Sequence, residues 1–161
     1  MRPGFRGIDE ADVRFRLLDW ILDFVTARRV EVTGDSMAPA IYAGSRLVVS
    51  ARAYRRARPA RFDVVMLRSP DAGGREDLKR IVGLPEEHVL LDAGRLFVDG
   101  TEITEPHLGR SAGNADSNRH EWRTDPDEYV VLGDNRAHST DSRSYGPVSR
   151  QRIVGRVVRR F

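Results

Sequence analysis

The chain has 161 residues, of which 40% are hydrophobic and 32% are charged, a composition typical of one globular domain rather than of a disordered chain or a membrane bundle. It contains no cysteine, which excludes disulfides and metal sites made of thiolates. Its 27 basic and 24 acidic residues give a net charge of +3, and because they are interspersed without a basic stripe, no nucleic acid is expected as a partner.

Residues 9–28 have the pattern of an amphipathic helix, so residues 1–29 are predicted to form a helical segment before the main domain. The densest apolar stretch, Leu17 to Val25, contains Asp19 and Asp23 and is far shorter than the roughly 20 residues that cross a bilayer. It also lacks the uncharged core of a secretory signal. We expect its apolar face to pack on the domain or to touch a membrane surface peripherally, and the protein to be soluble and cytoplasmic.

From residue 30 to residue 161 the sequence predicts a mainly β domain. Short apolar runs are separated by turn signals such as Asp92-Ala93-Gly94 and Asp99-Gly100. Residues 105–127 are rich in Gly, Ser, Asn, Asp and Pro, and are predicted to be one long polar surface loop. The predicted strands are Val30–Thr33, Arg46–Ser50, Asp63–Leu67, Asp77–Leu84, His88–Leu91, Leu96–Val98, Tyr129–Leu132 and Ile153–Val158.

A serine lies on a tight loop after the first predicted strand, in the segment GDSMAP that begins at Gly34. A loop leaving a strand can expose the hydroxyl of Ser36 and place backbone N–H groups beside it, as a nucleophile requires. Serines in such turns are common, so this segment alone is weak evidence for catalysis.

Lys79 is the only lysine, since 26 of the 27 basic residues are arginine. Arginine stays protonated in proteins, whereas a buried lysine can be neutral near pH 7 and accept a proton. Lys79 lies in a predicted strand with Leu78 and Ile81 beside it, and apolar surroundings lower the pKa of an amine. Lys79 is therefore a candidate general base for the serine, and the alternative is an exposed lysine on a strand.

The four histidines offer the more common serine–histidine arrangement. His107 and His120 fall within the predicted polar loop, His88 opens a strand after two glutamates, and His138 lies in a charged turn. Each is therefore expected to be a surface residue. Four dispersed histidines are also a poor metal site, so no metal or other cofactor is expected.

A third segment, from Tyr129 to Val148, reads YVVLGDNRAHSTDSRSYGPV. Together with GDSMAP around Ser36 and KRIVGLP beginning at Lys79, and in the same order, it resembles the conserved boxes of type I signal peptidases. The resemblance covers roughly residues 32–156. It implies a signal-peptidase-like fold of coiled antiparallel sheets, and a serine endopeptidase that removes a signal, leader or propeptide from a specific precursor bound as an extended strand.

The same resemblance implies a role for individual residues. Ser36 matches the family's nucleophile, and Lys79 matches its general base, giving a Ser/Lys dyad. Ser139 matches the serine that hydrogen-bonds and orients the lysine. Asp141 and Arg143 match a charged pair that braces the site.

Further positions match the substrate-binding side of such enzymes. The backbone N–H of Ser36 would donate to the oxyanion, and Gly34 stands where some members have a second, hydroxyl donor. Cleavage is expected after small residues such as alanine, because the pocket for the residue before the cut matches Val32, Met37, Ile41 and Leu78.

Three other functions remain open at this point. The second choice, after a specific precursor, is the general secretory role of such peptidases. A peptide-binding module derived from such a protease would capture a leader without cleaving it, although the presence of Ser36, Lys79 and Ser139 argues against this. A self-cleaving repressor would use a related Ser/Lys pair, but the N-terminal segment shows no DNA-binding helix-turn-helix.

Overall fold

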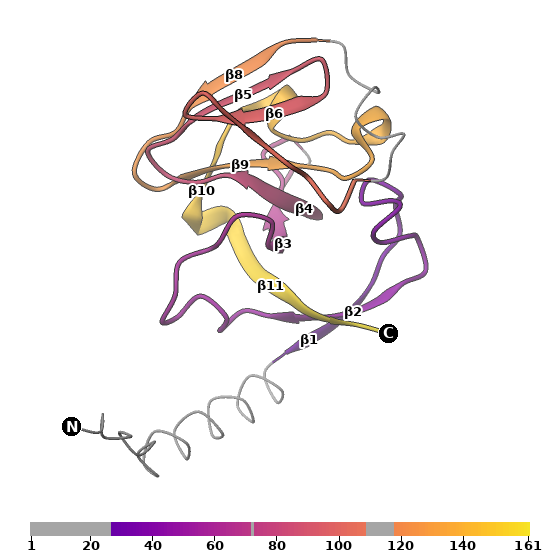
Figure 1. Ribbon diagram of the computed structural model, residues 1–161. Helices are drawn as coiled ribbons and strands as arrows, with labels where there is room; N and C mark the ends of the chain where they lie inside the picture. The colour runs from indigo at the N-terminus through magenta and orange to yellow at the C-terminus, as the bar shows by residue number, and fades with distance from the viewer. Residues whose placement is uncertain (1–26, 72, 109–117) are drawn as a thin grey trace, which may run out of the picture.

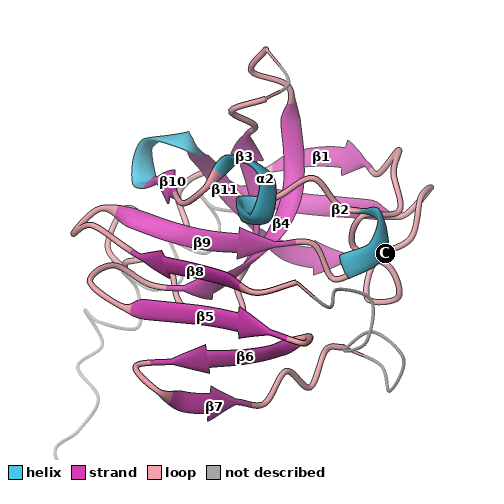
Figure 2. Cartoon of the chain, turned by 90° about the horizontal axis from the view of Figure 1, so that it is seen from above, coloured by secondary structure: helices cyan, strands magenta, loops and turns pink. Residues whose placement is uncertain are grey.

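The computed structural model describes residues 27–71, 73–108 and 118–161, in which two antiparallel sheets account for nearly all regular structure (Figures 1 and 2). Short helical turns are η2 (Arg136–His138), α2 (Ser142–Tyr145) and η3 (Arg150–Arg152). The strands are β1 (Arg28–Glu31), β2 (Arg46–Ser50), β3 (Val64–Arg68), β4 (Glu76–Gly83), β5 (His88–Asp92), β6 (Arg95–Val98), β7 (Thr101–Ile103), β8 (His120–Arg123), β9 (Glu128–Leu132), β10 (Val148–Ser149) and β11 (Ile153–Arg160).

The larger sheet has the order β1-β2-β11-β3-β4-β9-β10, and the smaller one has the order β7-β6-β5-β8. The prediction of a mainly β fold with coiled antiparallel sheets is thus confirmed. Strand β4 lies inside the larger sheet, where Lys79 faces Val65 on β3 and Arg80 faces Leu132 on β9. A lysine in an interior strand is shielded from solvent by the strands on both sides. A lysine in an edge strand would have a neighbouring strand on one side only.

The smaller sheet is a meander closed by two tight hairpin turns. Ala93 and Gly94 have φ values of 47° and 76°, and Asp99 and Gly100 have φ values of 49° and 79°. Positive φ at both central residues is typical of the two-residue turns whose twist fits antiparallel strands. The turns predicted from the sequence at these two places are confirmed.

Three buried apolar clusters hold the described residues together. One contains Val82 and Leu132 from the larger sheet and Val89 and Leu91 from the smaller one, so it joins the two sheets. The sheets approach closely here, since a Cβ on Gly83 would stand 2.6 Å from a Val89 methyl carbon. A second cluster packs around Tyr54, and the third consists of Val32, Met37, Ile41 and Leu47.

The structure departs from the expected 105–127 loop at its C-terminal end, where residues 120–123 form β8 and pair with β5. His120 and Trp122 are partly buried while Glu121 and Arg123 are exposed, which is the two-residue alternation of a half-buried strand. Trp122 packs against the cluster between the sheets. Four residues among polar neighbours are too few for the alternation to stand out in the sequence.

Smaller differences concern short elements and one boundary. Strand β1 begins at Arg28 rather than Val30, and β7, β10 and α2 were not predicted. Most of the predicted N-terminal helical segment, up to residue 26, lies outside the described residues. Within the part of the chain that is described, no helix has the length and apolar character needed to span a membrane.

Candidate active site

Ser36 lies in the turn that follows β1, and this turn is tied to the third segment (Tyr129–Val148). The backbone N–H of Asn135 donates to the carbonyl oxygen of Ser36 at 2.9 Å. The side-chain amide of Asn135 donates to the carbonyl oxygen of Asp35 at 3.1 Å. Inside the turn, the N–H of Ala38 donates to the same Asp35 oxygen at 3.0 Å. One asparagine therefore holds two consecutive carbonyls of the serine loop.

Lys79 reaches the serine from β4. Its Nζ lies 3.3 Å from Ser36 Oγ and 3.1 Å from the carbonyl oxygen of Leu78, and the residue is only 3% exposed. Burial lowers the pKa of Lys79 below its usual value, while the nearby carboxylates of Asp77 and Asp141 raise it in part. A neutral amine within hydrogen-bonding reach of a hydroxyl is the arrangement in which an amine can take the hydroxyl proton.

Ser139 stands beside the same pair, but the predicted hydrogen bond to Lys79 is not formed. Its Oγ is buried and has no hydrogen-bond partner among the described residues. The hydroxyl lies close enough to Asp141 to help lower the pKa of that carboxyl, although its geometry falls outside that of a hydrogen bond. An unsatisfied hydroxyl in this position is free to turn towards a new partner.

Gly133 packs the third segment directly onto this region. A Cβ at this position would stand 2.2 Å from Ser139 Oγ and 2.6 Å from the carbonyl oxygen of Ser36. No side chain fits there without moving one of the two serines. The glycine of the Gly133-Asp134-Asn135 motif is therefore required by close packing, a role that its sequence position alone did not reveal.

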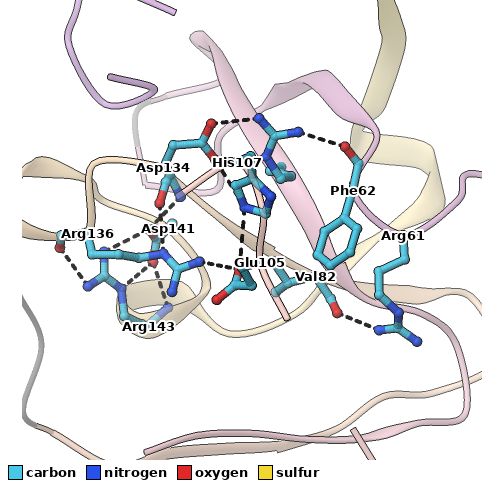
Figure 3. Close-up of polar contacts among 11 residues, drawn as sticks. Arg61, Phe62, Val82, Glu105, His107, Asp134, Arg136, Asp141 and Arg143 are labelled. Atoms are coloured by element: carbon cyan, nitrogen blue, oxygen red, sulfur yellow. Dashed lines mark hydrogen bonds and ion pairs between the residues drawn. The ribbon is translucent and has the colours of Figure 1, made fainter. Parts of the chain in front are cut away.

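Asp141 and Arg143 form a two-point ion pair (Figure 3), with Nε–Oδ1 and Nη2–Oδ2 distances of 2.9 Å each. Asp141 is fully buried and also accepts the N–H of Gly133 at 2.9 Å. Burial by itself raises the pKa of Asp141, but the hydrogen bonds from Arg143 and Gly133 outweigh it and hold the pKa below its usual value. Arg143 further donates to the carbonyl oxygens of Arg136 and Ser139.

A buried cluster of five charged or titratable side chains lies next to this pair and was missed by the sequence reasoning (Figure 3). Arg80 makes two hydrogen bonds to Asp134, at 2.8 and 2.7 Å. Arg136 contacts Glu105 at 2.5 Å. His107 Nε2 lies between the two acids, 3.5 Å from Glu105 and 3.7 Å from Asp134. His107, expected on the surface, has a side chain only 10% exposed.

A cleft of about 420 Å³ runs between β1 with the serine loop and the first half of β4. It contains both Ser36 and Lys79, and Val32, Met37 and Leu78 from the predicted pocket line it. Ile41 belongs to the same apolar cluster as Val32 and Met37 but does not line the cleft. The structure thus places the dyad and three of the four predicted pocket residues together, with Ile41 behind them.

Gly34 also lines this cleft, and a Cβ built on it would meet nothing within 4 Å. The space that a hydroxyl donor would fill is open here. A larger hollow of about 570 Å³ lies around Arg29, Leu47 and Phe161, and the described side chains that line it include no pair of nucleophile and base.

The remaining histidines form no catalytic or metal-binding group. His88 pairs with Glu121 at 2.6 Å on the smaller sheet, and His120 stacks on Trp122. His138 lines the cleft beside Thr140. Across the described ranges, His, Asp and Glu nowhere gather into a set that could hold a metal ion.

Comparisons with known proteins place this chain among relatives of one family. A family model described as signal peptidase, peptidase S26, matches residues 14–161. Signal peptidase I of Leptolyngbya laminosa is 30% identical over 169 residues, covering 99% of this chain and 80% of that protein. Signal peptidase I V of Bacillus subtilis strain 168 is 32% identical over 161 residues, covering 88% of this chain and 95% of that protein. The crystal structure of a signal peptidase I from Enterococcus faecalis V583 has a TM-score of 0.54 and 27% identity, covering 63% of this chain and 97% of that one.

Proposed function

The chain belongs to the signal peptidase family, peptidase S26, and is a serine endopeptidase; from this premise we propose that Ser36 is its nucleophile and Lys79 its general base. The observation that carries the proposal is the buried Lys79 amine, 3.3 Å from Ser36 Oγ. We further propose that the enzyme removes a signal, leader or propeptide from a specific precursor. Its cytoplasmic location and a peripheral membrane contact through residues 9–28 stay predictions.

The proposed reaction needs only the dyad and water. Neutral Lys79 takes the Oγ proton as Ser36 attacks the carbonyl carbon of the scissile bond, and the resulting ammonium returns the proton to the departing amine as the C–N bond breaks. The acyl group remains as an ester on Ser36. Lys79 then takes a proton from water, whose oxygen attacks the ester, and the proton finally returns to Ser36 Oγ.

The surrounding residues are proposed to position this pair. The Ser36 N–H is the donor to the oxyanion, and with glycine at position 34 a second donor has to come from the backbone. Asp141 and Arg143 brace the segment that carries Ser139. Since the Ser139 hydroxyl is buried without a partner, it can turn to hydrogen-bond the Lys79 amine and fix its direction.

Substrate selection is proposed to rest on the apolar side of the cleft. Val32, Met37 and Leu78 line it, and Met37 is only 1% exposed. A small side chain before the cut, such as that of alanine, would lie against these three residues. Ile41 would act only by packing behind Met37, because it does not line the cleft.

The proposal is tested by incubating the purified chain with leader peptides that have alanine before the intended cut, and by identifying products by mass spectrometry. Cleavage after alanine by the wild type, absent in Ser36→Ala, is the expected result. Ser144→Ala, the same change at an exposed serine of α2, should cleave normally. Binding of these peptides without any product from the wild type would instead support the peptide-binding alternative.

A further inference from the structure

An ion pair crosses the far end of the cleft. Arg28 on β1 and Glu76 on β4 approach to 2.5 Å between Nη1 and Oε2, although these two strands are not hydrogen-bonded to each other and are separated by three strands in the sheet order. Glu76 also lines the cleft that contains Ser36 and Lys79. Because the larger sheet curls, β1 and β4 form opposite walls of the cleft. Arg28 from one wall meets Glu76 from the other at this end.

The position of this ion pair along the cleft is set by the register of β4. Three positions separate Glu76 from Lys79, which is roughly 10 Å of extended strand. Glu76 and Leu78 are two positions apart, so their side chains leave the same face of β4. Because the pocket for the residue before the cut is proposed at Leu78 and Val32, the preceding residues of a bound leader would run on towards Glu76 and Arg28.

The guanidinium of Arg28 shows what kind of side chain this carboxylate can bind. The Arg28 side chain is 63% exposed and that of Glu76 is 27% exposed, and ion pairs between such exposed groups are weak and easily exchanged. An arginine or lysine side chain of a substrate could therefore replace Arg28 at Glu76 with little loss of interaction free energy. Arg28 would then turn into solvent.

The other charges at this end favour the same class of substrate. Arg75 pairs with Asp77 at 3.5 Å, which leaves little net charge on those two groups. Glu31 also lines the cleft here. Among the described residues, the charged side chains at this end thus comprise two arginines and three acids, so a basic side chain would bring their net charge to zero and an acidic one would be repelled.

Building on the proposed function, we propose that Glu76 is a specificity-determining residue that binds a basic side chain a few residues before the scissile bond. The favoured substrate is then a leader with arginine or lysine three to six residues before the cut and a small residue at the cut. Arg28 occupies this place in the free enzyme.

The test uses peptides that share alanine before the cut and carry arginine, alanine or glutamate at one of the third to sixth positions before it. Dissociation constants are measured by fluorescence anisotropy with the Ser36→Ala chain, and kcat/KM is measured with the active chain. At one of these positions arginine should be preferred over glutamate by about 3- to 10-fold at low ionic strength. The preference should shrink in 1 M salt, where the Debye length is only about 3 Å.

Charge changes at Glu76 identify the residue responsible. Glu76→Gln should bring the arginine-to-glutamate ratio close to one, and Glu76→Lys should invert it. The matched control is Glu102→Lys, which makes the same charge change on β7 at the outer edge of the smaller sheet (Figure 2). This control should keep the wild-type ratio, because only the overall charge of the protein has changed.

The two proposals fail in different ways. Equal binding of arginine and glutamate peptides at every position, or an unchanged ratio in Glu76→Gln and Glu76→Lys, would overturn the role of Glu76 while leaving the peptidase intact. Charge-dependent binding that disappears in Glu76→Gln, without any cleavage by the wild type, would uphold the role of Glu76 and contradict the dyad.

Discussion

At the scale of single residues, the proposed chemistry depends on one amine in an unusual environment. Most of the arginines among the described residues are exposed to water, whereas the only lysine is 3% exposed and faces a serine hydroxyl. Burial lowers the pKa of Lys79, so the neutral form is available at a pH where an exposed lysine would be charged. The composition of the chain and the burial of Lys79 thus both single out the side-chain nitrogen of this residue.

Lys79→Arg is expected to fold but to lose activity. Arginine keeps the positive charge and most of the length, but its guanidinium stays protonated and cannot take the Ser36 proton. The rate of peptide cleavage should fall by about 10² to 10⁴, and circular dichroism should show a retained β fold. The reverse change at an exposed position, Arg95→Lys, serves as the control and should cleave normally. A folded Lys79→Arg enzyme with most of its activity would refute the general-base role.

Lys79→Met is expected to be inactive but more stable than the wild type at neutral pH. Because the pKa of Lys79 is lower in the folded than in the unfolded chain, the unfolded chain binds more protons between the two values. The stability present above the unfolded pKa is therefore lost as the pH falls through the folded pKa. Urea unfolding at pH 10.5 and at pH 7 should show a larger advantage of Lys79→Met at pH 7. An advantage independent of pH would mean that Lys79 is charged in the folded protein.

At the scale of elements, the active site depends on how closely the loop after β9 approaches the serine turn. Asn135 holds two carbonyls of the turn, and Gly133 leaves no space for a side chain between Ser139 and the Ser36 carbonyl. The residues proposed to react or to position the dyad come from β4, the turn after β1 and the loop after β9. Their relative positions are therefore decided by loop packing rather than by any one strand.

Gly133→Ala is expected to reduce kcat by more than its effect on folding explains. The added methyl group would push against Ser139 and the Ser36 carbonyl, so it displaces the nucleophile or the hydroxyl beside it. Gly155→Ala is a matched control, since its Cβ would stand 2.7 Å from the Ser50 carbonyl oxygen, between β11 and β2. Both variants should lose stability in urea unfolding, but only Gly133→Ala should lose kcat in the folded fraction. Equal kcat values in the two folded variants would contradict this role of Gly133.

At the scale of the whole molecule, a cluster of charged side chains joins the segment after β7 of the smaller sheet to the side of the larger sheet that carries the candidate active site. Glu105 and His107 follow β7, Asp134 and Arg136 follow β9, and Arg80 lies on β4 next to Lys79. The side chains of Glu105 and Arg136 are 6% and 2% exposed. Burying such groups is unfavourable unless each charge keeps its partner.

Glu105→Gln is expected to destabilise the fold strongly, because it leaves the buried Arg136 guanidinium without its carboxylate. Breaking a buried pair by removing one partner costs about 3–5 kcal/mol, measured here as the free energy of unfolding in urea. Glu102→Gln removes an exposed carboxylate three residues earlier and should change the stability by less than about 0.5 kcal/mol. A small effect at both positions would mean that water replaces the lost carboxylate at Arg136.

The sequence by itself determined the fold class, most strand positions and the two hairpin turns, because local residue patterns encode them. It also determined the membership of the family, because contiguous motifs identify it. It also singled out Ser36 and Lys79, whose roles remain a proposal. Only the tertiary structure revealed β8, the burial of His107, the open hydroxyl of Ser139 and the ion pair between Arg28 and Glu76. Each of these depends on segments that are distant in the chain and are brought together by the curl and packing of the two sheets, which no local pattern encodes.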